Sequence, residues 1–492
     1  MTSDNHGNTS PSSTVPATPG RKPLKERLRE IKPSRWVRFG IVSAIYLLWV
    51  VLMGNPWLLF GWLIIIDLYI TAFVPWGWWR DKKGVTRAVM AWVDAIVYAL
   101  VLIYFIFGFV GQQYEIPSSS LEKSLLVGDR LWVDKTRYGS RVPQTPIHFP
   151  LAQHTLPVLN TKSYVENPQL KYHRMPGWSS IKRGDIVVFN YPQGDTVALK
   201  IQNPDYYQIC NELRRNGIAD PAEYIRKNPD RFGEVIWRPV DRRENYVKRT
   251  IGLPGERLRI VNDTIFIDGK PIKEPTNVQY NYVIASRTPI DASRWMDLGV
   301  RGEDFNQNAG QDKEAGIWYY DVPLTYEMKG IVDKWPELVQ PPMRESETGL
   351  FDLSGVFPYN APYNWKRDNM GEIWIPKRGS TLHLTDANYP LYERVIHTYE
   401  GNSLEKRNGK FFINGKEQNY YTFKMDYYWM MGDNRDRSAD SRYWGFVPED
   451  HIVGTPVAIL LSLDKERSLS EGKIRWNRIL SNPNPDKKAG LW

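Results

Sequence analysis

The chain has almost no cysteine. Cys210 is the single one among 492 residues, so no intramolecular disulfide can form and metal sites built from cysteines are excluded. The seven histidines show no HExxH or other ligand spacing, and none sits in a catalytic motif. Any cysteine nucleophile would have to be Cys210. The composition therefore favours a nucleophile other than cysteine and a base other than histidine.

The N-terminal tail has almost nothing to bury. Residues 1–23 are Ser, Thr, Pro, Asn and Gly for the most part, a composition typical of disorder. Eight Lys or Arg follow between Arg21 and Arg38. A nucleic-acid arm is one interpretation, but a basic block just before an apolar run is more typical of the cytoplasmic flank of a membrane span. We predict a disordered, basic cytoplasmic tail over 1–35 and no nucleic-acid partner.

Three apolar segments follow this tail, at about 39–53, 57–79 and 89–110. A span needs about 20 residues, so the second and third qualify and the first is marginal. We predict a membrane region over 36–111 with two to three transmembrane helices. Asp67 and Asp94 lie inside the apolar segments, which leaves a transport path open as a weaker alternative.

The flanking charges predict an orientation for these spans. The tail before the first segment is basic, and the loop after the second carries Arg80, Lys82, Lys83 and Arg87. By the positive-inside rule the N-terminus and this loop are cytoplasmic, and the chain after Val110 lies outside the cytoplasm.

From Gly111 onward the chain has the pattern of a β-rich domain. Residues 186–189 follow a Gly-Asp turn and form a short apolar run, and 205–216 has a helical pattern. Asp268-Gly269 and Asn414-Gly415 each separate apolar strands, which predicts two hairpins with type I′ turns. We predict a catalytic core in two parts, 112–270 and 409–480, an inserted cap subdomain over 271–408, and a frayed C-terminal tail over 481–492.

Ser120 lies in the loop Pro117-Ser118-Ser119-Ser120-Leu121, a few residues after the last apolar segment. A serine nucleophile needs a base, and no histidine stands out, so a lysine is the alternative. A lysine has a pKa of about 10.4 in water and acts as a base near neutrality only after burial lowers it. Lys248, in the otherwise apolar strand 246–255, is the best candidate, although the pattern alone is also typical of an exposed edge-strand lysine. Strand alternation places Arg249 on the opposite face.

Two other segments resemble known functional motifs only in part. Ser120-Leu121-Glu122-Lys123 matches the S-x-x-K pair of penicillin-binding proteins, but the Ser-Asp-Asn and Lys-Thr-Gly partners are missing from the folded part of the sequence. The segment 432–448 is dense in Asp and Arg, but it fails as a calcium loop, because Ser441 and Val447 occupy the positions that need Gly and Glu.

Four segments, in this order along the chain, resemble the signature segments of bacterial type I signal peptidases: 117–129, 183–189, 246–255 and 432–448. Each alone would be a weak signal, but four in the family's order, behind apolar spans, make a specific match. The resemblance implies N-terminal transmembrane helices followed by a mainly-β signal-peptidase-like catalytic domain, here with a large inserted subdomain.

The resemblance also implies roles for individual residues. Ser120 would be the nucleophile and Lys248 the general base, with the oxyanion held by the Ser118 hydroxyl and the Ser120 N–H and with Ser438 orienting the Lys248 amine. A structural network is implied for Asp433, Asp440 and Arg442, and a substrate pocket for small residues such as Ala is implied for Ile116, Leu121, Tyr246 and Val247. Leu121, Lys123 and Ser119 stand where the family commonly has Met, often Pro and often Gly, so the detailed pocket shape stays open.

We therefore expect a membrane-bound serine endopeptidase that removes signal peptides from preproteins after Ala-x-Ala, without a metal or cofactor. The expected partners are preproteins, the lipid bilayer and, as a candidate, the secretion translocon. The expected location is the bacterial inner membrane, with the catalytic domain on the periplasmic side. Two alternatives stay open: a catalytically inactive β-scaffold related to this family, and an unrelated hydrolase with a histidine base.

Overall fold

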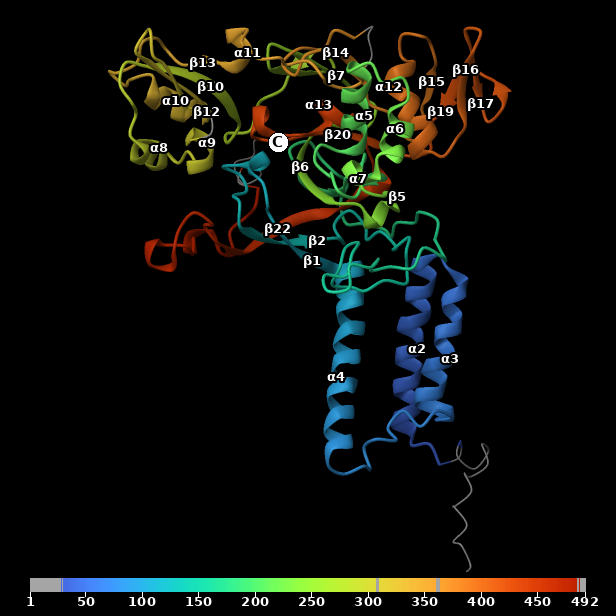
Figure 1. Cartoon of the computed structure of the whole chain (residues 1–492). Coiled ribbons are helices and arrows are strands. Elements are labelled where there is room, and N and C mark those ends of the chain that lie inside the picture. The colour runs from blue at the N-terminus through green and yellow to red at the C-terminus, as the bar shows by residue number, and fades with distance from the viewer. Residues whose placement is uncertain (1–27, 29, 307–308, 360–362, 485, 487–492) are drawn as a thin grey trace, which may run out of the picture. The chain divides into compact units, whose positions relative to one another are not determined.

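The computed structural model describes residues 28, 30–306, 309–359, 363–484 and 486 (Figure 1). The chain divides into two compact units, Met1–Val97 and Tyr98–Trp492. Most of the predicted tail 1–35 lies outside the described residues. Its last three residues are helical, because the first long helix begins at Pro33.

The first unit contains a helical hairpin. Its elements are α2 (Pro33–Met53), η1 (Pro56–Leu58), α3 (Leu59–Ile66) and η2 (Asp67–Thr71). Gly54 ends α2 in the left-handed region at φ 63°. The Trp62 indole donates to Ser43 Oγ at 3.0 Å, and the Tyr46 hydroxyl donates to the Leu58 carbonyl at 2.6 Å. A Cβ on Gly61 would lie 2.1 Å from the Tyr46 hydroxyl oxygen, so this close packing requires glycine.

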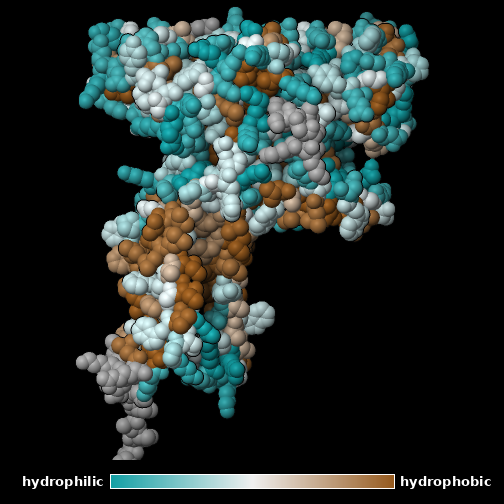
Figure 2. All heavy atoms as spheres, turned by 180° about the vertical axis from the view of Figure 1, so that it is seen from behind, coloured by the Kyte–Doolittle hydropathy of each residue, from teal (hydrophilic) through white to brown (hydrophobic). Residues whose placement is uncertain are grey.

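Two helices are long and apolar enough to cross a membrane, Pro33–Met53 and Val85–Val110, while the apolar helix Pro56–Thr71 is shorter. The second of these comprises α4 (Val85–Phe105) and η3 (Ile106–Val110). Exposed apolar side chains cover the hairpin helices (Figure 2). The second apolar segment is thus shorter than predicted, and the first is fully helical. Asp67 explains the early end, because its carboxylate accepts hydrogen bonds from the backbone of Phe73 and Val74 and from the Trp76 indole.

The second unit is built on a seven-stranded antiparallel sheet (Figure 1). Its strands, in spatial order, are β1 (Gly111–Glu115), β2 (Asp129–Asp134), β22 (Ile452–Ser462), β3 (Ile186–Asn190), β6 (Asn245–Gly252), β20 (Tyr427–Met431) and β21 (Val447–Pro448). The strand predicted after the Gly-Asp turn is β3, which is buried at every position. Strand β1 lies at one edge of the sheet, directly before the serine loop.

Both predicted hairpins are confirmed. The first is β8 (Thr264–Ile267) with β9 (Lys270–Pro271), and the second is β17 (Lys410–Ile413) with β18 (Lys416–Glu417). The turn residues Asp268, Gly269, Asn414 and Gly415 all have positive φ, as type I′ turns require. Strand β7 (Arg257–Val261) pairs with β8, and β16 (Leu404–Arg407) pairs with β17.

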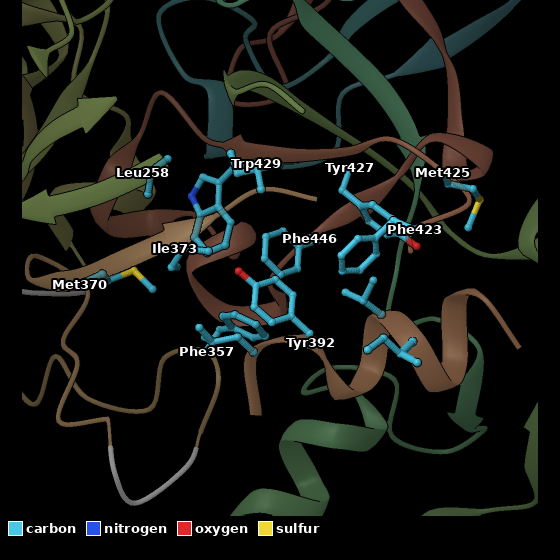
Figure 3. Close-up of a cluster of buried hydrophobic side chains, with 14 of the residues drawn as sticks. Leu258, Phe357, Met370, Ile373, Tyr392, Phe423, Met425, Tyr427, Trp429 and Phe446 are labelled. Atoms are coloured by element: carbon cyan, nitrogen blue, oxygen red, sulfur yellow. The ribbon is translucent and has the colours of Figure 1, made fainter. Parts of the chain in front are cut away.

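A large aromatic core joins these hairpins to the central sheet (Figure 3). The rings of Tyr392 and Phe446 stack at 5.8 Å, and Trp429 packs edge-on against Phe446 at 5.9 Å. Tyr392 belongs to α12 (Tyr389–Arg394), which continues as η6 (Val395–Tyr399). Strands β15 (Thr381–His383) and β19 (Tyr420–Thr422) pair beside this core.

The stretch 271–408, predicted as one inserted cap, is divided between two cores. Its first part forms a four-stranded sheet with a separate hydrophobic cluster: β10 (Gln279–Ser286), β11 (Ala309–Asp312), β12 (Ile317–Thr325), β13 (Met343–Arg344), α8 (Ala292–Leu298), α9 (Gly302–Asn306), α10 (Tyr326–Val332) and α11 (Glu345–Thr348). Its last part contains β14 (Met370–Trp374), which pairs with β7 and joins the aromatic core. That pairing joins strands far apart in sequence, which local patterns do not reveal.

A further group of helices and strands forms a small hydrophobic cluster of its own. The predicted helix near 205–216 is α5 (Tyr206–Arg215), capped by Asp205, and it is followed by α6 (Pro221–Lys227), α7 (Pro229–Phe232) and the strand pair β4 (Thr196–Ala198) and β5 (Val235–Trp237). Of the predicted frayed tail 481–492, only 481–484 and 486 are among the described residues, and most of them are packed against the fold. Asn484 and Asp486 are buried, and both contact Arg249 of β6.

Candidate active site

Ser120 lies in a short 3₁₀ turn, η4 (Ser119–Leu121), which follows edge strand β1. The turn is closed by the Glu122 N–H, which donates to the Ser119 carbonyl at 2.9 Å. It is also tied to the distant segment 432–437: the Asn434 backbone N–H donates to the Ser120 carbonyl, and the Asn434 side chain donates to the Ser119 carbonyl, both at 3.2 Å. Ser120 is only 7% exposed. The backbone of the turn that carries the Ser120 hydroxyl is therefore held by its own hydrogen bond and by two hydrogen bonds from Asn434.

Lys248 approaches Ser120 from strand β6. Its Nζ donates a hydrogen bond to Ser120 Oγ at 2.7 Å, and the lysine is only 4% exposed. Burial lowers the pKa of the Lys248 amine to about 8 and outweighs the opposing effect of the Asp440 and Asp433 carboxylates. The amine is thus partly neutral at neutral pH, and a neutral amine at this distance can take the proton of the serine hydroxyl.

The predicted network residues form two buried carboxylate–guanidinium pairs. Asp433 receives two hydrogen bonds from Arg249, at 2.8 and 2.6 Å, and Asp440 receives two from Arg442, at 2.9 and 2.8 Å. Burial opposes ionisation of each carboxyl, but the guanidinium outweighs it and leaves the pKa of both aspartates below the ordinary value. Ser124 adds a bond to Asp433 at 2.6 Å. The site is held by charge-assisted bonds with fixed geometry.

Gly432 allows Ser438 and the Ser120 carbonyl each to lie close to the backbone at position 432. A Cβ at this position would lie 2.2 Å from Ser438 Oγ and 2.6 Å from the Ser120 carbonyl oxygen. The Gly432 N–H donates to the Asp440 carboxylate at 3.0 Å, which holds the backbone of Gly432 in place. Ser438 is buried there, with its hydroxyl donating to the Ala439 carbonyl at 3.4 Å. Ser118, by contrast, is exposed in extended backbone two residues before Ser120.

The four predicted pocket residues separate into two groups. Ile116 and Leu121 are buried in one apolar cluster, and Val247 packs against it. Tyr246 lies in a different cluster, where its ring stacks on Tyr191 at 4.5 Å. The structure therefore brings Ile116, Leu121 and Val247 into one apolar cluster. Tyr246 lies on the same face of β6 as Lys248, whose Nζ is 5.7 Å from the centre of the Tyr246 ring.

Sequence reasoning missed several residues of this site. Arg249 was placed on the opposite face of its strand without a role, yet it holds Asp433, and the C-terminal Asn484 accepts from it at 3.0 Å. Asn434 and Gly432 lie inside the signature segment 432–448, so the segment itself was the signal that could have found them. The contacts of Asn484 and Asp486 have no sequence signal.

The rival bases make other contacts. Lys123 donates to the Gly299 carbonyl. His451, the most buried histidine in the described part of the chain, bonds to Asp450 at 2.6 Å and to Arg243 at 2.7 Å. Over the described residues, no group of three or more His, Cys, Asp or Glu is arranged to hold a metal ion.

Comparison of the sequence with known proteins finds relatives for most of the chain. A family model described as "Signal peptidase, peptidase S26" matches residues 89–309 and 375–461. The chain is 24% identical over 378 residues to the signal peptidase I of Buchnera aphidicola subspecies Acyrthosiphon pisum, covering 77% of this chain and 76% of that protein. It is 21% identical over 409 residues to a Helicobacter pylori signal peptidase I, covering 81% and 93% of the two chains. It is 23% identical over 384 residues to the Haemophilus influenzae signal peptidase I, covering 78% and 72%. The two matched segments contain Ser120, Lys248 and the whole of 432–448.

Proposed function

The chain belongs to the signal peptidase family, and from this premise we propose that Ser120 is its nucleophile and Lys248 its general base. The curated relatives named signal peptidase I identify it as a serine peptidase, a hydrolase that removes signal peptides. The observation that carries the proposed dyad is the 2.7 Å distance between Lys248 Nζ and Ser120 Oγ. An inactive scaffold is disfavoured, because Ser120, Lys248 and Ser438 are all retained.

The proposed reaction follows from these two groups. Neutral Lys248 takes the proton of Ser120 while Oγ attacks the carbonyl carbon of the scissile bond, which gives a tetrahedral oxyanion. The Ser120 N–H and the Ser118 hydroxyl are proposed to hold this oxyanion. The intermediate collapses as the C–N bond breaks, and protonated Lys248 gives its proton to the leaving amine. Water, deprotonated by the again neutral Lys248, then hydrolyses the acyl-enzyme and regenerates Ser120.

Strand β1 is the proposed binding edge for the substrate. It lies at the end of the sheet order and leads through Pro117 into the serine turn. An extended peptide can add to such an edge through backbone hydrogen bonds, with alternate side chains entering pockets. The cluster that contains Ile116, Leu121 and Val247 would then limit the residue before the cut to a small one, which agrees with cleavage after Ala-x-Ala.

The membrane arrangement is part of the same proposal. Two helices of this chain have the length and composition of membrane spans. We propose that the N-terminus and the loop 80–87 face the cytoplasm and that the catalytic unit lies on the outer side of a bacterial inner membrane. A preprotein leaving the secretion translocon would meet the site there.

The dyad is tested by three alanine variants of the full-length protein, assayed on a purified preprotein. We expect Ser120→Ala and Lys248→Ala to lower cleavage to background, a loss of at least about 10³-fold, because each removes a partner of the reacting pair. Lys123→Ala is the matched control and should retain most of the activity, since Lys123 contacts Gly299 instead. An active Lys248→Ala variant would refute the assignment.

A further inference from the structure

A second polar site lies in the catalytic unit, away from Ser120. It is a cavity of about 290 Å³ between the end of the apolar helix, strand β1, Lys135 directly after β2, and the loop 141–153. Its lining includes Lys135, Arg141, Arg242, Asp241 and His148. None of these residues has a part in the proposed cleavage reaction.

The cavity carries more positive than negative charge. Its lining side chains include three basic ones, Lys135, Arg141 and Arg242, and one carboxylate, Asp241. Asp241 Oδ2 accepts from the backbone N–H and the hydroxyl of Thr145, both at 2.9 Å, and lies 3.5 Å from Arg242. Its other oxygen, Oδ1, has no hydrogen-bond partner, so this single carboxylate offsets part of the positive charge. One further carboxylate, Asp450, lies near Arg141 but bonds to His451.

The partners of Lys135 and Arg141 are neutral oxygens. Lys135 Nζ donates to the Phe107 carbonyl and to the Gln112 side chain, the latter at 3.1 Å. Arg141 donates to the Asp450 carbonyl and to the Asn190 side chain, the latter at 2.7 Å. Burial, with Arg141 and Arg242 as nearby cations, lowers the pKa of Lys135 to about 7. An anion in the cavity would relieve this repulsion and keep the lysine charged.

The position of the cavity indicates where such an anion comes from. Phe107 and Gly108, at the end of the apolar helix Val85–Val110, form part of its wall. The loop on its other side exposes three large apolar side chains, Ile147 (54% exposed), Phe149 (38%) and Leu151 (57%). The Tyr104 hydroxyl donates to the Pro146 carbonyl at 2.9 Å, so the loop is attached to the end of the helix.

We propose that this cavity binds the phosphate of an anionic phospholipid head group, with Ile147, Phe149 and Leu151 in contact with the acyl-chain region beside it. Basic residues at the end of a membrane span attract anionic lipids, and pockets between such elements hold head groups. A free phosphate ion carries the same charge, but it has no apolar part that could contact the exposed apolar side chains of the loop. The volume suits a head group and excludes a whole lipid.

The test uses the full-length protein in a neutral detergent, with bound lipid counted by native mass spectrometry. The probes are dioctanoyl-phosphatidylglycerol, dioctanoyl-phosphatidylcholine and inorganic phosphate. We expect the anionic lipid to bind at least about tenfold more tightly than the zwitterionic one, and inorganic phosphate to compete weakly. Lys135→Gln and Arg141→Gln should each weaken binding of the anionic lipid about tenfold, while Lys416→Gln, an exposed lysine of β18, should leave it unchanged.

Several results would overturn this proposal. Equal retention of the two lipids by the wild-type protein would do so without any variant. Unchanged lipid binding in both Lys135→Gln and Arg141→Gln, each with an unaltered melting temperature, would also contradict the proposal. Full competition by inorganic phosphate at the same concentration as the lipid would show that the ligand is not a lipid. Binding measured on Ser120→Ala separates this site from the dyad, because lipid retention there should equal that of the wild type.

Discussion

Lys248 is the residue whose charge state controls the proposed reaction. Its pKa of about 8 is reached through burial, while both nearby aspartates act in the opposite direction. At pH 7 about a tenth of the amine is neutral, and the neutral fraction grows until the pH exceeds the pKa. We expect kcat/KM for a preprotein peptide in detergent, measured from pH 5 to 10, to rise about tenfold from pH 7 to its plateau, with a single limb near pH 8.

A histidine base would give a different profile. Its limb would lie near pH 6.5, the ordinary histidine value. A limb at that pH, together with cleavage by Lys248→Ala, would contradict the Ser/Lys assignment. For His451, whose pKa is lowered by burial, the limb would lie below pH 6.5.

Gly432 is the second residue on which the site geometry depends. In Gly432→Ala the new methyl group would overlap both Ser438 Oγ and the Ser120 carbonyl, so the serine turn must shift. A displacement of about 1 Å costs on the order of 10²-fold in rate, and we expect that loss in kcat/KM. The control is Gly330→Ala in helix α10, where nothing lies within 4 Å of a new Cβ. Cleavage by the two variants at equal rates would contradict this account of Gly432.

At the scale of elements, the C-terminal segment supports strand β6. Asp486 is only 1% exposed, lies 3.4 Å from the Arg249 guanidinium and also receives the Thr276 N–H at 3.3 Å. Arg249 keeps Asp433 as a partner when Asp486 is changed, so the loss should be smaller than for breaking a whole buried pair.

We therefore expect Asp486→Asn to lower the free energy of unfolding by about 1–3 kcal/mol. Measured by thermal unfolding in detergent, this corresponds to a drop of about 1–4 °C in melting temperature for a chain of this length. Asp297→Asn, an exposed residue of α8, is the control and should melt like the wild type. A melting temperature unchanged by Asp486→Asn would indicate that the C-terminal segment is not part of the folded core.

Local patterns predicted the elements that depend on neighbouring residues. The turns at Asp268-Gly269 and Asn414-Gly415 were predictable because only a few residues adopt positive φ easily, and β3 was predictable from its apolar run. The alternation of side chains along β6, which puts Lys248 and Arg249 on opposite faces, was also predictable from the local sequence. What local patterns could not predict are pairings between distant segments, such as β7 with β14 or Arg249 with Asp486.

The sheet made by β10 to β13 illustrates the same limit. Its residues were predicted to be a peripheral cap, yet β10 contacts the signature segment directly: the Gln279 N–H donates to the Asp433 carbonyl at 2.9 Å, and the Asn281 N–H donates to the Asp436 carboxylate at 2.7 Å. Arg437 in turn pairs with Asp304 of α9. This sheet therefore supports the catalytic segment, although residues 310–374 lie outside the family match.

At the scale of the whole molecule, the proposed function requires the catalytic unit and the loop 80–87 to lie on opposite sides of the membrane. The basic loop at the start of α4 and the β-rich unit after its end are separated by one apolar helix, which is long enough to cross once. Cleavage of exported preproteins is useful only on the side to which they are exported. The arrangement of charge along the sequence and the proposed reaction thus predict the same topology.

The scarcity of cysteine makes this topology directly measurable. Cys210 is buried, so a Cys210→Ser background leaves no thiol to react, and single cysteines can be introduced by Lys82→Cys and Lys416→Cys at two exposed lysines. A membrane-impermeant maleimide should label position 416 and spare position 82 in right-side-out vesicles, and should do the reverse in inverted ones. Labelling of both positions after detergent treatment controls for reactivity. Labelling of position 82 from the outside would reverse the orientation, and the catalytic unit would then face the compartment in which its preprotein substrates are made.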